Sequence, residues 1–371
     1  MEYVELGNVA TYINGYAFKP EQRGKIGLPI IRIQDLNDNS YDLGFFDGSY
    51  PEQIEINTGD ILISWSGSLG VYKWSKGKAL LNQHIFKVVF NKINIDKEFF
   101  CYAVKNSLSV MSQQTHGATM KHITKKDFDK VLIPYPSLNT QRKIAQKLNI
   151  VTELIVFYET ELSLMEQLIK ARFIEMFGDP IINPYGFPVK KIDEVAVLNK
   201  GITYSPDDIS KEGIIVLRSG NIKGNAFDLE DIVRISKKIS NDKLVNENDI
   251  LMCNRNGSVN LVGKVAKIPK LEEKMTFGTF MTIVRSEIFE YLFVFFQMNA
   301  FREQIKFQTA VAINQISLPL LASVKVPIPT NELIKEFADF VRQVDKSREE
   351  VKKSLEKTQQ LYDSLMQEYF G

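Results

Sequence analysis

The sequence has few residues of the kinds that build metal centres or disulfide frameworks. Only two cysteines, Cys101 and Cys253, and three histidines, His84, His116 and His122, occur among its 371 residues. No acidic residue or cysteine stands at ligand spacing from the histidines, so we expect no metal site. Two cysteines in different halves of the chain suggest no disulfide framework and fit a reducing compartment.

Long hydrophobic runs and an excess of charge of one sign are also missing. The most apolar stretch, residues 291–298, is too short to cross a bilayer, and the first residues lack the pattern of a signal peptide. We therefore expect a soluble, cytoplasmic protein. The net charge of +1 gives no general attraction to nucleic acid, so any affinity for DNA has to come from local groups of side chains.

The motifs of nucleotide-binding and DNA-modifying enzymes are absent as well. The segment Ser64–Gly70 contains glycines but lacks the Lys-Ser/Thr ending of a phosphate-binding loop. The segment Asn183–Gly186 is the nearest approach to an adenine methyltransferase motif, but it lacks the second proline and is typical of a turn. Carboxylates are scattered rather than clustered as a nuclease metal site requires. We expect no catalytic residue, no metal and no cofactor on this chain.

The chain contains an internal duplication. The segment Pro29–Arg32 matches Ile215–Arg218 with the same offset that relates Gly15 to Gly201. Further matches pair Gly59–Ser64 with Asn248–Cys253 and Ile133–Pro136 with Val326–Pro329. A repeat of about 190 residues is too long for a solenoid or propeller unit, so it indicates a duplicated domain that is each time followed by a helix.

Two long helices are predicted, over residues 139–177 and 331–370. Their apolar residues recur at alternating steps of four and three, which is the heptad spacing of a coiled coil, although Arg348 and Thr358 interrupt the second seam. Ser137 or Asn139 is expected to cap the first helix, and Thr330 or Asn331 the second. Gly178 should end the first helix.

Each helix would be about 60 Å long, more than either domain needs for its own core. A helix of this kind packs on its own domain, forms an intermolecular coiled coil or pairs with its counterpart in the chain. We expect the last arrangement, an antiparallel intramolecular coiled coil in a pseudo-twofold symmetric molecule. Related readers of DNA half-sites usually lie roughly 34 Å apart, about one helical turn.

The expected fold class is therefore two duplicated mixed α/β domains with two long α-helices. The expected boundaries are 1–137 for the first domain, 138–178 for the central helix, 179–329 for the second domain and 330–371 for the C-terminal helix. Strands are predicted over Ile30–Ile33, Asp60–Ser64, Ile85–Phe90, Ile214–Leu217, Ile250–Cys253 and Met281–Val284. The pattern does not determine the order of the strands.

Several motifs together resemble the specificity subunits of type I restriction-modification systems over nearly the full length of the chain. They are Pro29–Arg32 with Asp35 and Leu36, Gly59–Leu62, Gly117–Ile123, Ile133–Pro136 with Gln141, and Phe177–Pro180. The second copy departs from them, with Ile334 in the place of Gln141. The resemblance implies two target recognition domains that read the halves of a split, asymmetric double-stranded DNA target.

The resemblance also implies partners. Modification (methyltransferase) subunits would dock on the two long helices and carry the chemistry with S-adenosylmethionine, and a restriction subunit would join them for cleavage. This chain would itself be non-catalytic. Two other classes are weighed against it: a self-contained DNA-modifying enzyme, and a helical scaffold protein without DNA specificity.

Candidate DNA-binding residues are basic, amide and hydroxyl side chains in the loops of each domain, because phosphate contacts give affinity and base-edge contacts give specificity. In the first domain they are Lys19, Arg23, Lys25, Trp65, Ser66, Ser68, His116, Thr119, Lys121 and His122. In the second domain they are Tyr204, Arg218, Asn254, Arg255, Asn256, Ser258, Gln308, Asn314 and Gln315.

The segment Asn254–Asn256 is the most informative of these groups. Arginine can donate to both acceptors of guanine, and asparagine can bond both edge groups of adenine. Any one of these residues can instead belong to a solvated polar loop. For Arg32 and Arg218, which recur in both halves beside predicted strands, a structural ion pair is an equal alternative.

Overall fold

The computed structural model describes residues 2–36, 44–114, 124–306 and 315–371, and the chain divides into two compact units. Unit 1 consists of Met1–Glu159 and Lys353–Gly371, and unit 2 is the continuous stretch Thr160–Lys352. Each unit therefore contains one predicted domain together with parts of both long helices.

Unit 1 is built on two four-stranded sheets. The first is antiparallel, in the order β2 (Thr11–Asn14), β9 (Ile85–Val89), β6 (Ile61–Ser64) and β7 (Gly70–Lys73). The second has the order β4 (Phe45–Phe46), β3 (Leu28–Ile31), β8 (Ala79–Leu81) and β5 (Glu55–Ile56), and its β3 and β8 are parallel. The inward-facing residues of β6 and β9 are buried, because both strands lie in the middle of the first sheet.

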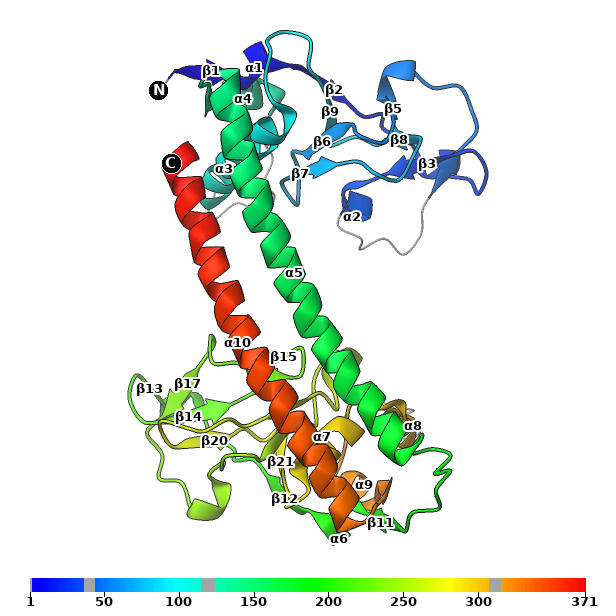
Figure 1. The fold of residues 1–371 in the computed structure, drawn as a ribbon, viewed down its shortest axis with the longest axis vertical. Coiled ribbons are helices and arrows are strands. Elements are labelled where there is room, and N and C mark those ends of the chain that lie inside the picture. The colour runs from blue at the N-terminus through cyan, green and yellow to red at the C-terminus, as the bar shows by residue number, and fades with distance from the viewer. Residues whose placement is uncertain (1, 37–43, 115–123, 307–314) are drawn as a thin grey trace. The chain divides into compact units, whose positions relative to one another are not determined.

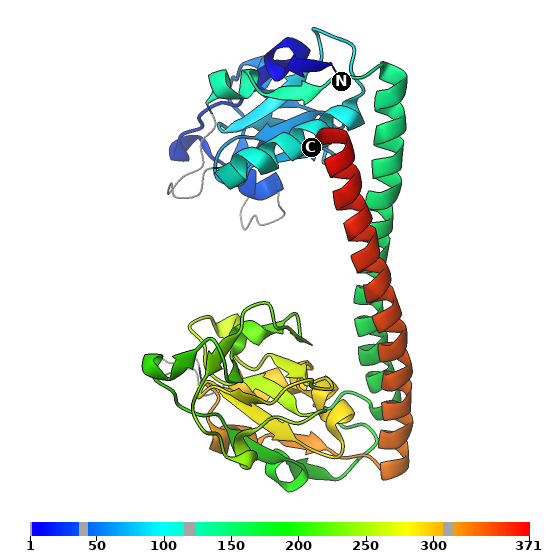
Figure 2. The same cartoon turned by 90° about the vertical axis from the view of Figure 1, so that its left-hand side faces the viewer.

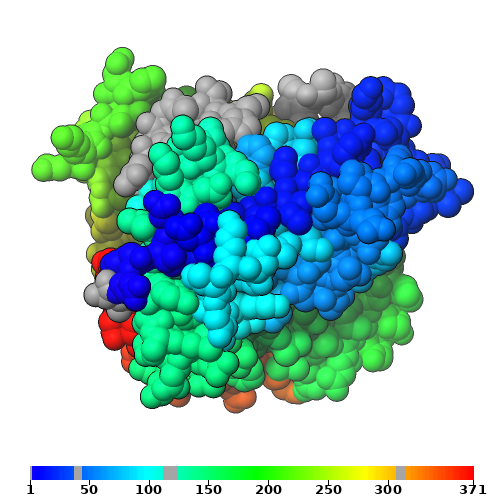
Figure 3. Space-filling model, turned by 90° about the horizontal axis from the view of Figure 1, so that it is seen from above, coloured from blue at the N-terminus to red at the C-terminus, as the bar shows by residue number. Residues whose placement is uncertain are grey.

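A small outer layer closes unit 1. Strand β1 (Tyr3–Glu5) pairs with β10 (Leu132–Pro134), and the amide of Leu6 donates to the carbonyl of Val131, 2.9 Å away. In Figure 3 these first residues, in dark blue, run across the outer face of the unit. The unit's helices are α1 (Leu6–Val9), α2 (Ile33–Leu36), α3 (Lys97–Gln114) and α4 (Lys125–Asp129), and η1 (Pro20–Gln22) and η2 (Glu52–Ile54) are 3-10 turns.

Unit 2 repeats this plan. Its antiparallel sheet has the order β12 (Val197–Lys200), β21 (Met281–Arg285), β18 (Ile250–Cys253) and β19 (Val265–Lys267). Its second sheet has the order β13 (Ile209–Ser210), β17 (Val233–Ile235), β14 (Ile214–Leu217) and β20 (Met275–Phe277), with β14 and β20 parallel. Two smaller pairs join β11 (Val189–Lys191) to β22 (Lys325–Pro327) and β15 (Ile222–Lys223) to β16 (Ala226–Phe227).

The remaining elements of unit 2 are short. Its helices are α6 (Ile192–Val195), α7 (Phe289–Phe295), α8 (Asn299–Lys306) and α9 (Leu318–Ser323), and its 3-10 turns are η3 (Pro206–Asp208), η4 (Ser219–Asn221), η5 (Asn241–Lys243) and η6 (Val259–Leu261). Figure 1 labels these four helices. No helix among the residues that the structure describes is both long and apolar enough to span a membrane.

The sheet topology confirms the internal duplication and the mixed α/β fold. The order β2-β9-β6-β7 in unit 1 recurs as β12-β21-β18-β19 in unit 2, with the same pairing directions. Each predicted strand overlaps a strand of the structure, with ends that agree to within one residue for all but the first strand, whose expected bounds Ile30–Ile33 are shifted by two residues. Strand β3 stops at Ile31, and Ile33 begins helix α2, because the carboxylate of Asp35 accepts from the backbone amide of Arg32 at 2.7 Å and turns the chain.

The two long helices are α5 (Leu138–Phe177) and α10 (Asn331–Phe370). Of the capping alternatives, the structure selects Ser137 and Thr330, whose hydroxyl oxygens accept from the amides of Thr140 and Leu333 at 3.4 Å. Gly178 ends α5 with a φ of +72°, the left-handed conformation that glycine tolerates best.

Within unit 2 the long helices are antiparallel neighbours. Arg172 of α5 donates to Glu336 of α10 at 2.9 Å, and Glu166 accepts from Arg348 at 2.6 Å, so the order along α5 runs against the order along α10. Figure 2 shows the two helices side by side in this unit and likewise in unit 1. Arg348, which interrupts the predicted heptad seam, thus takes part in the pairing as an ion pair.

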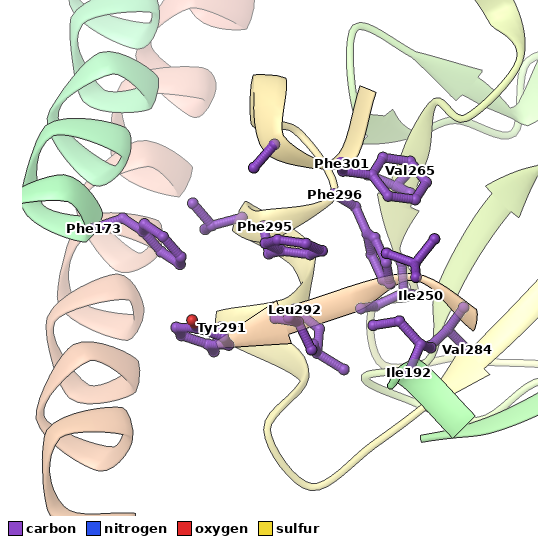
Figure 4. Packing of buried hydrophobic residues seen from close by; sticks show 14 of the residues in the cluster. Phe173, Ile192, Ile250, Val265, Val284, Tyr291, Leu292, Phe295, Phe296 and Phe301 are labelled. Carbon is purple, nitrogen blue, oxygen red and sulfur yellow. The ribbon is translucent and has the colours of Figure 1, made fainter. Parts of the chain in front are cut away.

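In each unit, aromatic residues from the C-terminal end of a long helix complete the core. In unit 2, Phe173 of α5 stacks on Tyr291 of α7 with ring centroids 4.9 Å apart, as Figure 4 shows. In unit 1, Phe370 of α10 packs on Phe99 of α3 at 5.3 Å, and its carbonyl accepts from the side chain of Asn106 at 3.0 Å. Each globular core therefore includes a helix end contributed by the other repeat.

Candidate nucleic-acid interface

In both units the candidate residues that follow β6 or β18 are held by the same pattern of backbone hydrogen bonds, which we call the scaffold. The residue after strand β18, Asn254, donates its amide to the carbonyl of Phe280 at 2.9 Å, and the residue after β6, Trp65, donates to the carbonyl of His84 at 3.2 Å. Since β6 and β18 match in register, Trp65 corresponds to Asn254, and Ser66 corresponds to Arg255.

A repeated glycine allows this scaffold to close. A Cβ atom on Gly15 would lie 1.9 Å from the carbonyl oxygen of Asn82, and one on Gly201 would lie 2.0 Å from that of Gly278. No side chain fits at these distances. The glycines that first revealed the duplication are thus required where β2 and β12 end against the turn before β9 and β21.

In unit 1 an indole fills the position after β6. The Trp65 ring stacks on Phe86 with centroids 5.6 Å apart and meets the His84 ring edge-on at 5.0 Å. Its Nε1 donates to Asn14 Oδ1 at 3.3 Å. His84 has a φ of +72°, so its backbone lies in the left-handed region. Trp65 is therefore held partly inside the unit rather than free at its surface.

The other candidates of unit 1 are spread over two loops. Lys19, Arg23 and Lys25 are exposed on the segment around η1. Ser66 and Ser68 lie in the loop between β6 and β7, where the buried Ser64 hydroxyl donates to the carbonyl of Ser68 at 2.5 Å. This loop borders a cavity of about 550 Å³ whose opposite wall is helix α3.

Six candidates fall outside the described residues. They are His116, Thr119, Lys121 and His122 in the first half of the chain, and Gln308 and Asn314 in the second.

The three neighbours Asn254, Arg255 and Asn256 in unit 2 are in different situations. Asn254 is only 6 % exposed, and its buried Oδ1 has no hydrogen-bond partner among the described residues. Asn256 is committed on both sides of its amide, since its Nδ2 donates to Ser219 at 3.1 Å and its Oδ1 accepts from the amide of Ser258 at 2.9 Å. Arg255 is the exposed member of the three.

The backbone of this loop is fixed from two directions. The carbonyl of Phe280 accepts from the amides of both Asn254 and Arg255, at 2.9 and 3.3 Å, and the carbonyl of Asn254 accepts from Ile316 at 2.8 Å. An isolated antiparallel bridge pairs Arg255 with Gln315. The loop is therefore bonded on one side to the turn before β21 and on the other side to the segment before α9.

Buried polar groups stabilise the same loop from below. The Cys253 thiol lies 3.6 Å from the carbonyl of Arg255, and burial raises the pKa of this thiol, so it stays protonated and able to donate. Arg302 of α8 is half-buried and donates to the carbonyl of Val262 at 2.5 Å, and burial lowers the pKa of its guanidinium.

Tyr204 and Arg218 lie near this loop and make different contacts. The Tyr204 ring approaches the turn at Gly278, where a Cβ would lie 3.9 Å from it. Arg218 forms an ion pair with Asp231 at 2.8 Å, and Arg32 in unit 1 forms one with Asp35 at 3.3 Å. The ion-pair alternative left open by the sequence is thus present in both units.

The structure also brings to the site residues that sequence reasoning did not select. Phe280 is 50 % exposed, and the guanidinium carbon of Arg255 lies 5.0 Å from the centre of its ring. Ser219 bonds Asn256, and the hydroxyls of Thr203 and Thr279 lie 3.1 Å apart. The duplication could have identified Phe280, because this residue occupies the position of His84 in the first copy.

The family model described as the type I restriction modification DNA specificity domain matches the chain twice, over residues 1–166 and 184–360. The EcoBI specificity subunit of Escherichia coli is 23 % identical over 412 residues, covering 99 % of this chain and 85 % of the relative. The MjaVIII specificity subunit of Methanocaldococcus jannaschii is 22 % identical over 392 residues, covering 97 % and 91 %.

Solved structures show the same fold. The S subunit of a type I system from M. genitalium superposes with a TM-score of 0.57 at 16 % identity, covering all of this chain and 96 % of that one. A chain from a study of assembly and conformational transition in the type I system gives a TM-score of 0.54 at 15 % identity, with 100 % and 97 % coverage. With both halves matched by one family model, the chain belongs to the type I restriction-modification DNA specificity family.

Proposed function

We propose that this chain is the subunit of a type I restriction-modification complex that reads a split, asymmetric DNA sequence, with residues 1–137 and 179–329 as its two target recognition domains (domain 1 and domain 2). One observation carries the proposal. The same scaffold occurs twice and presents different side chains at matched positions, Ser66 in domain 1 and Arg255 in domain 2. Two readers with one backbone and different contact residues are suited to two different half-sites.

The chemistry is assigned to partner subunits rather than to this chain. Modification subunits would bring S-adenosylmethionine and transfer the methyl group, and a restriction subunit would join them for cleavage. The side chains at the scaffold are hydrogen-bonding and aromatic groups suited to binding. The two thiols, Cys101 and Cys253, are poor nucleophiles, since burial raises the pKa of both.

Helix α5 offers a docking surface for the modification subunits. In unit 1, Ile150, Leu154 and Phe157 are 58, 40 and 59 % exposed, and in unit 2, Leu164 and Leu168 are 56 and 50 % exposed. Their spacing of three and four residues places each group on one side of the helix, beside the seam that faces α10. A further helix can pack in such a position, as in a helical bundle.

The second long helix repeats this apolar surface at one position only, where Leu361 matches Leu168 and is 49 % exposed. The positions of α10 that match Ile150, Leu154, Phe157 and Leu164 are occupied by the polar residues Gln343, Ser347, Glu350 and Lys357. The exposed apolar side chains of α5 are therefore not a by-product of the duplicated heptad pattern. We assign them to partner helices of the modification subunits.

Substitution of Leu154 and Phe157 by glutamate tests this surface. Charges there would oppose burial against a partner, so the variant should elute without modification subunits when the co-expressed complex is separated by size. Lys357→Glu on α10 is the matched control and should assemble normally. Assembly of the Leu154→Glu, Phe157→Glu variant at wild-type affinity would place the docking surface elsewhere.

The proposed function itself is tested by mapping methylated bases. The complete complex should methylate one bipartite sequence, and the purified chain alone should transfer no methyl group while still binding DNA containing that sequence. Methyl transfer by the chain alone would favour the self-contained enzyme. An assembled complex that methylates without regard to sequence would contradict the assignment of specificity to this chain.

A further inference from the structure

The arginines of domain 2 differ in what their guanidinium groups bind. Arg218, Arg234 and Arg285 each form an ion pair with a carboxylate, at 2.8, 2.6 and 2.7 Å, and these pairs neutralise their charges. Arg255 is exposed and bonds no carboxylate among the residues that the structure describes. Its charge and the donor atoms of its guanidinium are therefore directed to a ligand or to solvent.

An exposed arginine usually samples many conformations, but two features restrict Arg255. Its backbone is held between the carbonyl of Phe280, at 3.3 Å, and the bridge to Gln315. Its guanidinium lies over the half-exposed ring of Phe280 at 5.0 Å from the centroid. An aromatic ring below the guanidinium attracts the cation and limits the orientation of its plane while leaving the hydrogen-bonding edge open.

The neighbouring side chains cannot take over the same contact. Asn254 is buried, and both ends of the Asn256 amide are occupied by Ser219 and Ser258. The Asn256 side chain holds the loop, and of these three residues the exposed arginine presents its planar guanidinium to solvent. Such a fork matches the O6 and N7 acceptors of guanine in the major groove, which is the commonest specific contact of arginine with DNA.

The geometry points to Arg255 as the residue by which domain 2 selects a guanine in its half of the target, with Phe280 as a positioning residue for its guanidinium. This inference rests on the proposed function, since it names the base contact of one reading domain. It predicts that the half-site of domain 2 contains a G·C pair at one fixed position, and that the preference there depends on Arg255.

The test uses the complete complex with its modification subunits and a pool of synthetic DNA duplexes of random sequence. The bound fraction is sequenced for the wild type, Arg255→Gln, Arg255→Lys, Phe280→Leu and the control Arg234→Lys. Arg234 lies in the same domain but is committed to Glu273. Exchange of domain 2 identifies the half-site that this domain reads.

The Arg255→Gln variant should lose preference for guanine at one position of that half-site by about tenfold or more, as expected for loss of a bidentate contact. Arg255→Lys should retain the dependence of binding on salt, because the charge remains, but lose most of the discrimination. Phe280→Leu should weaken the preference at the same position only. Arg234→Lys should select the wild-type sequence.

Three outcomes would overturn the inference: a wild-type half-site of domain 2 without an invariant G·C pair, unchanged selection by Arg255→Gln, or equal weakening of all sequences by Arg255→Gln with a smaller salt dependence. The last result would assign Arg255 to a phosphate.

Because Arg255 is exposed, the lysine variant should fold normally, and its thermal unfolding and assembly with the modification subunits verify this. Failure of the wild-type complex to select any bipartite sequence would instead contradict the proposed function.

Discussion

At the scale of single residues, the scaffold separates side chains that hold the loop from side chains that are available for binding. Asn254 and Arg255 are adjacent in the sequence, yet one is 6 % exposed and the other faces solvent. The sequence identified this segment as a polar group next to a repeated strand. It could not separate the roles, because the partners Phe280 and Ser219 come from distant parts of the chain.

The ion pair of Asp249 with Arg285 anchors the sheet beneath the loop. Both carboxylate oxygens of Asp249, which is 2 % exposed, accept from Arg285 at 2.7 Å. Asp249→Asn should lower the free energy of unfolding by about 2 to 3 kcal/mol, because it leaves a half-buried cation without its partner. Urea unfolding of the full chain measures the change.

A matched control distinguishes this effect from a general loss of charge. Asp339 is 57 % exposed and pairs with Arg342 at 2.6 Å on the surface of α10. Asp339→Asn should change the stability by less than about 1 kcal/mol, as is usual for exposed pairs. Equal losses in the two variants would show that the burial of Asp249 has no special effect.

The cysteines provide a prediction on pH. Burial, with a contribution from Glu98, raises the pKa of the Cys101 thiol to about 12, above the ordinary value of about 8.5. At pH 8 about one thiol in ten thousand is then ionised, and alkylation should rise about tenfold for each pH unit. Iodoacetamide labelling followed by mass spectrometry should show slow modification of the native chain and rapid modification in urea. Rapid labelling of the folded protein at pH 8 would contradict the raised pKa of this partly buried thiol.

At the scale of elements, the long helices were the most predictable part of the chain. A heptad pattern over residues 139–177 and 331–370 is strong because it repeats many times, and the observed helices begin within one residue of it. The sequence was less clear about which helix each one packs against, because Arg348 interrupts the apolar seam. In the structure its charge is compensated by Glu166 across the seam.

The seam pair of Glu166 and Arg348 can be analysed by a double-mutant cycle. Glu166→Leu alone should destabilise the chain, because it leaves Arg348, which is 18 % exposed, with Asp345 at 3.8 Å as its remaining partner. The double change to leucine should restore most of the stability, since apolar residues replace a partly buried ion pair and leave no lone charge. A coupling energy below about 0.5 kcal/mol would show that the pair does not contribute to helix pairing.

Short elements were harder to predict. Ile33 follows Ile30, Ile31 and Arg32, and the prediction therefore extended the strand through it. The hydrogen bond from the amide of Arg32 to Asp35 starts helix α2 there instead. A local capping interaction of this kind outweighs the apolar pattern. The strand order was also beyond the sequence, because the parallel pairing of β3 with β8 joins segments about 50 residues apart.

The C-terminal end of α10 is expected to stabilise unit 1. Phe370→Ala would remove the contact with Phe99 and should cost about 2 kcal/mol, with faster hydrogen exchange of the amides in α3. Leu361→Ala, at a position 49 % exposed on the same helix, should have little effect. Unchanged protection of α3 in the Phe370 variant would show that the core of unit 1 is complete without α10.

At the scale of the whole molecule, the chain contains two copies of one domain whose side chains at matched loop positions have diverged. The repeated glycines, Gly15 and Gly201, preserve the backbone, while Trp65 and Ser66 are replaced by Asn254 and Arg255. Because the net charge is only +1, affinity for DNA would have to come from local groups of side chains. The sequence predicted this organisation because a duplication is visible without coordinates, but it does not reveal which bases are read.

Binding by the complete complex should be strongly dependent on salt. Each neutralised phosphate contributes about −0.9 to the slope of log affinity against log salt concentration. Titrations of a duplex containing the methylated sequence should therefore give a linear plot with a negative slope. A salt-independent affinity would contradict an interface based on phosphate contacts.

The most direct measurement exchanges domain 2 for that of a relative with a different target and then maps the methylated bases. Two independent readers predict a hybrid sequence in which the half read by domain 1 is unchanged and the other half is that of the donor. A new sequence in both halves, or loss of sequence preference in the half read by domain 1, would contradict the account of the chain as two separate readers.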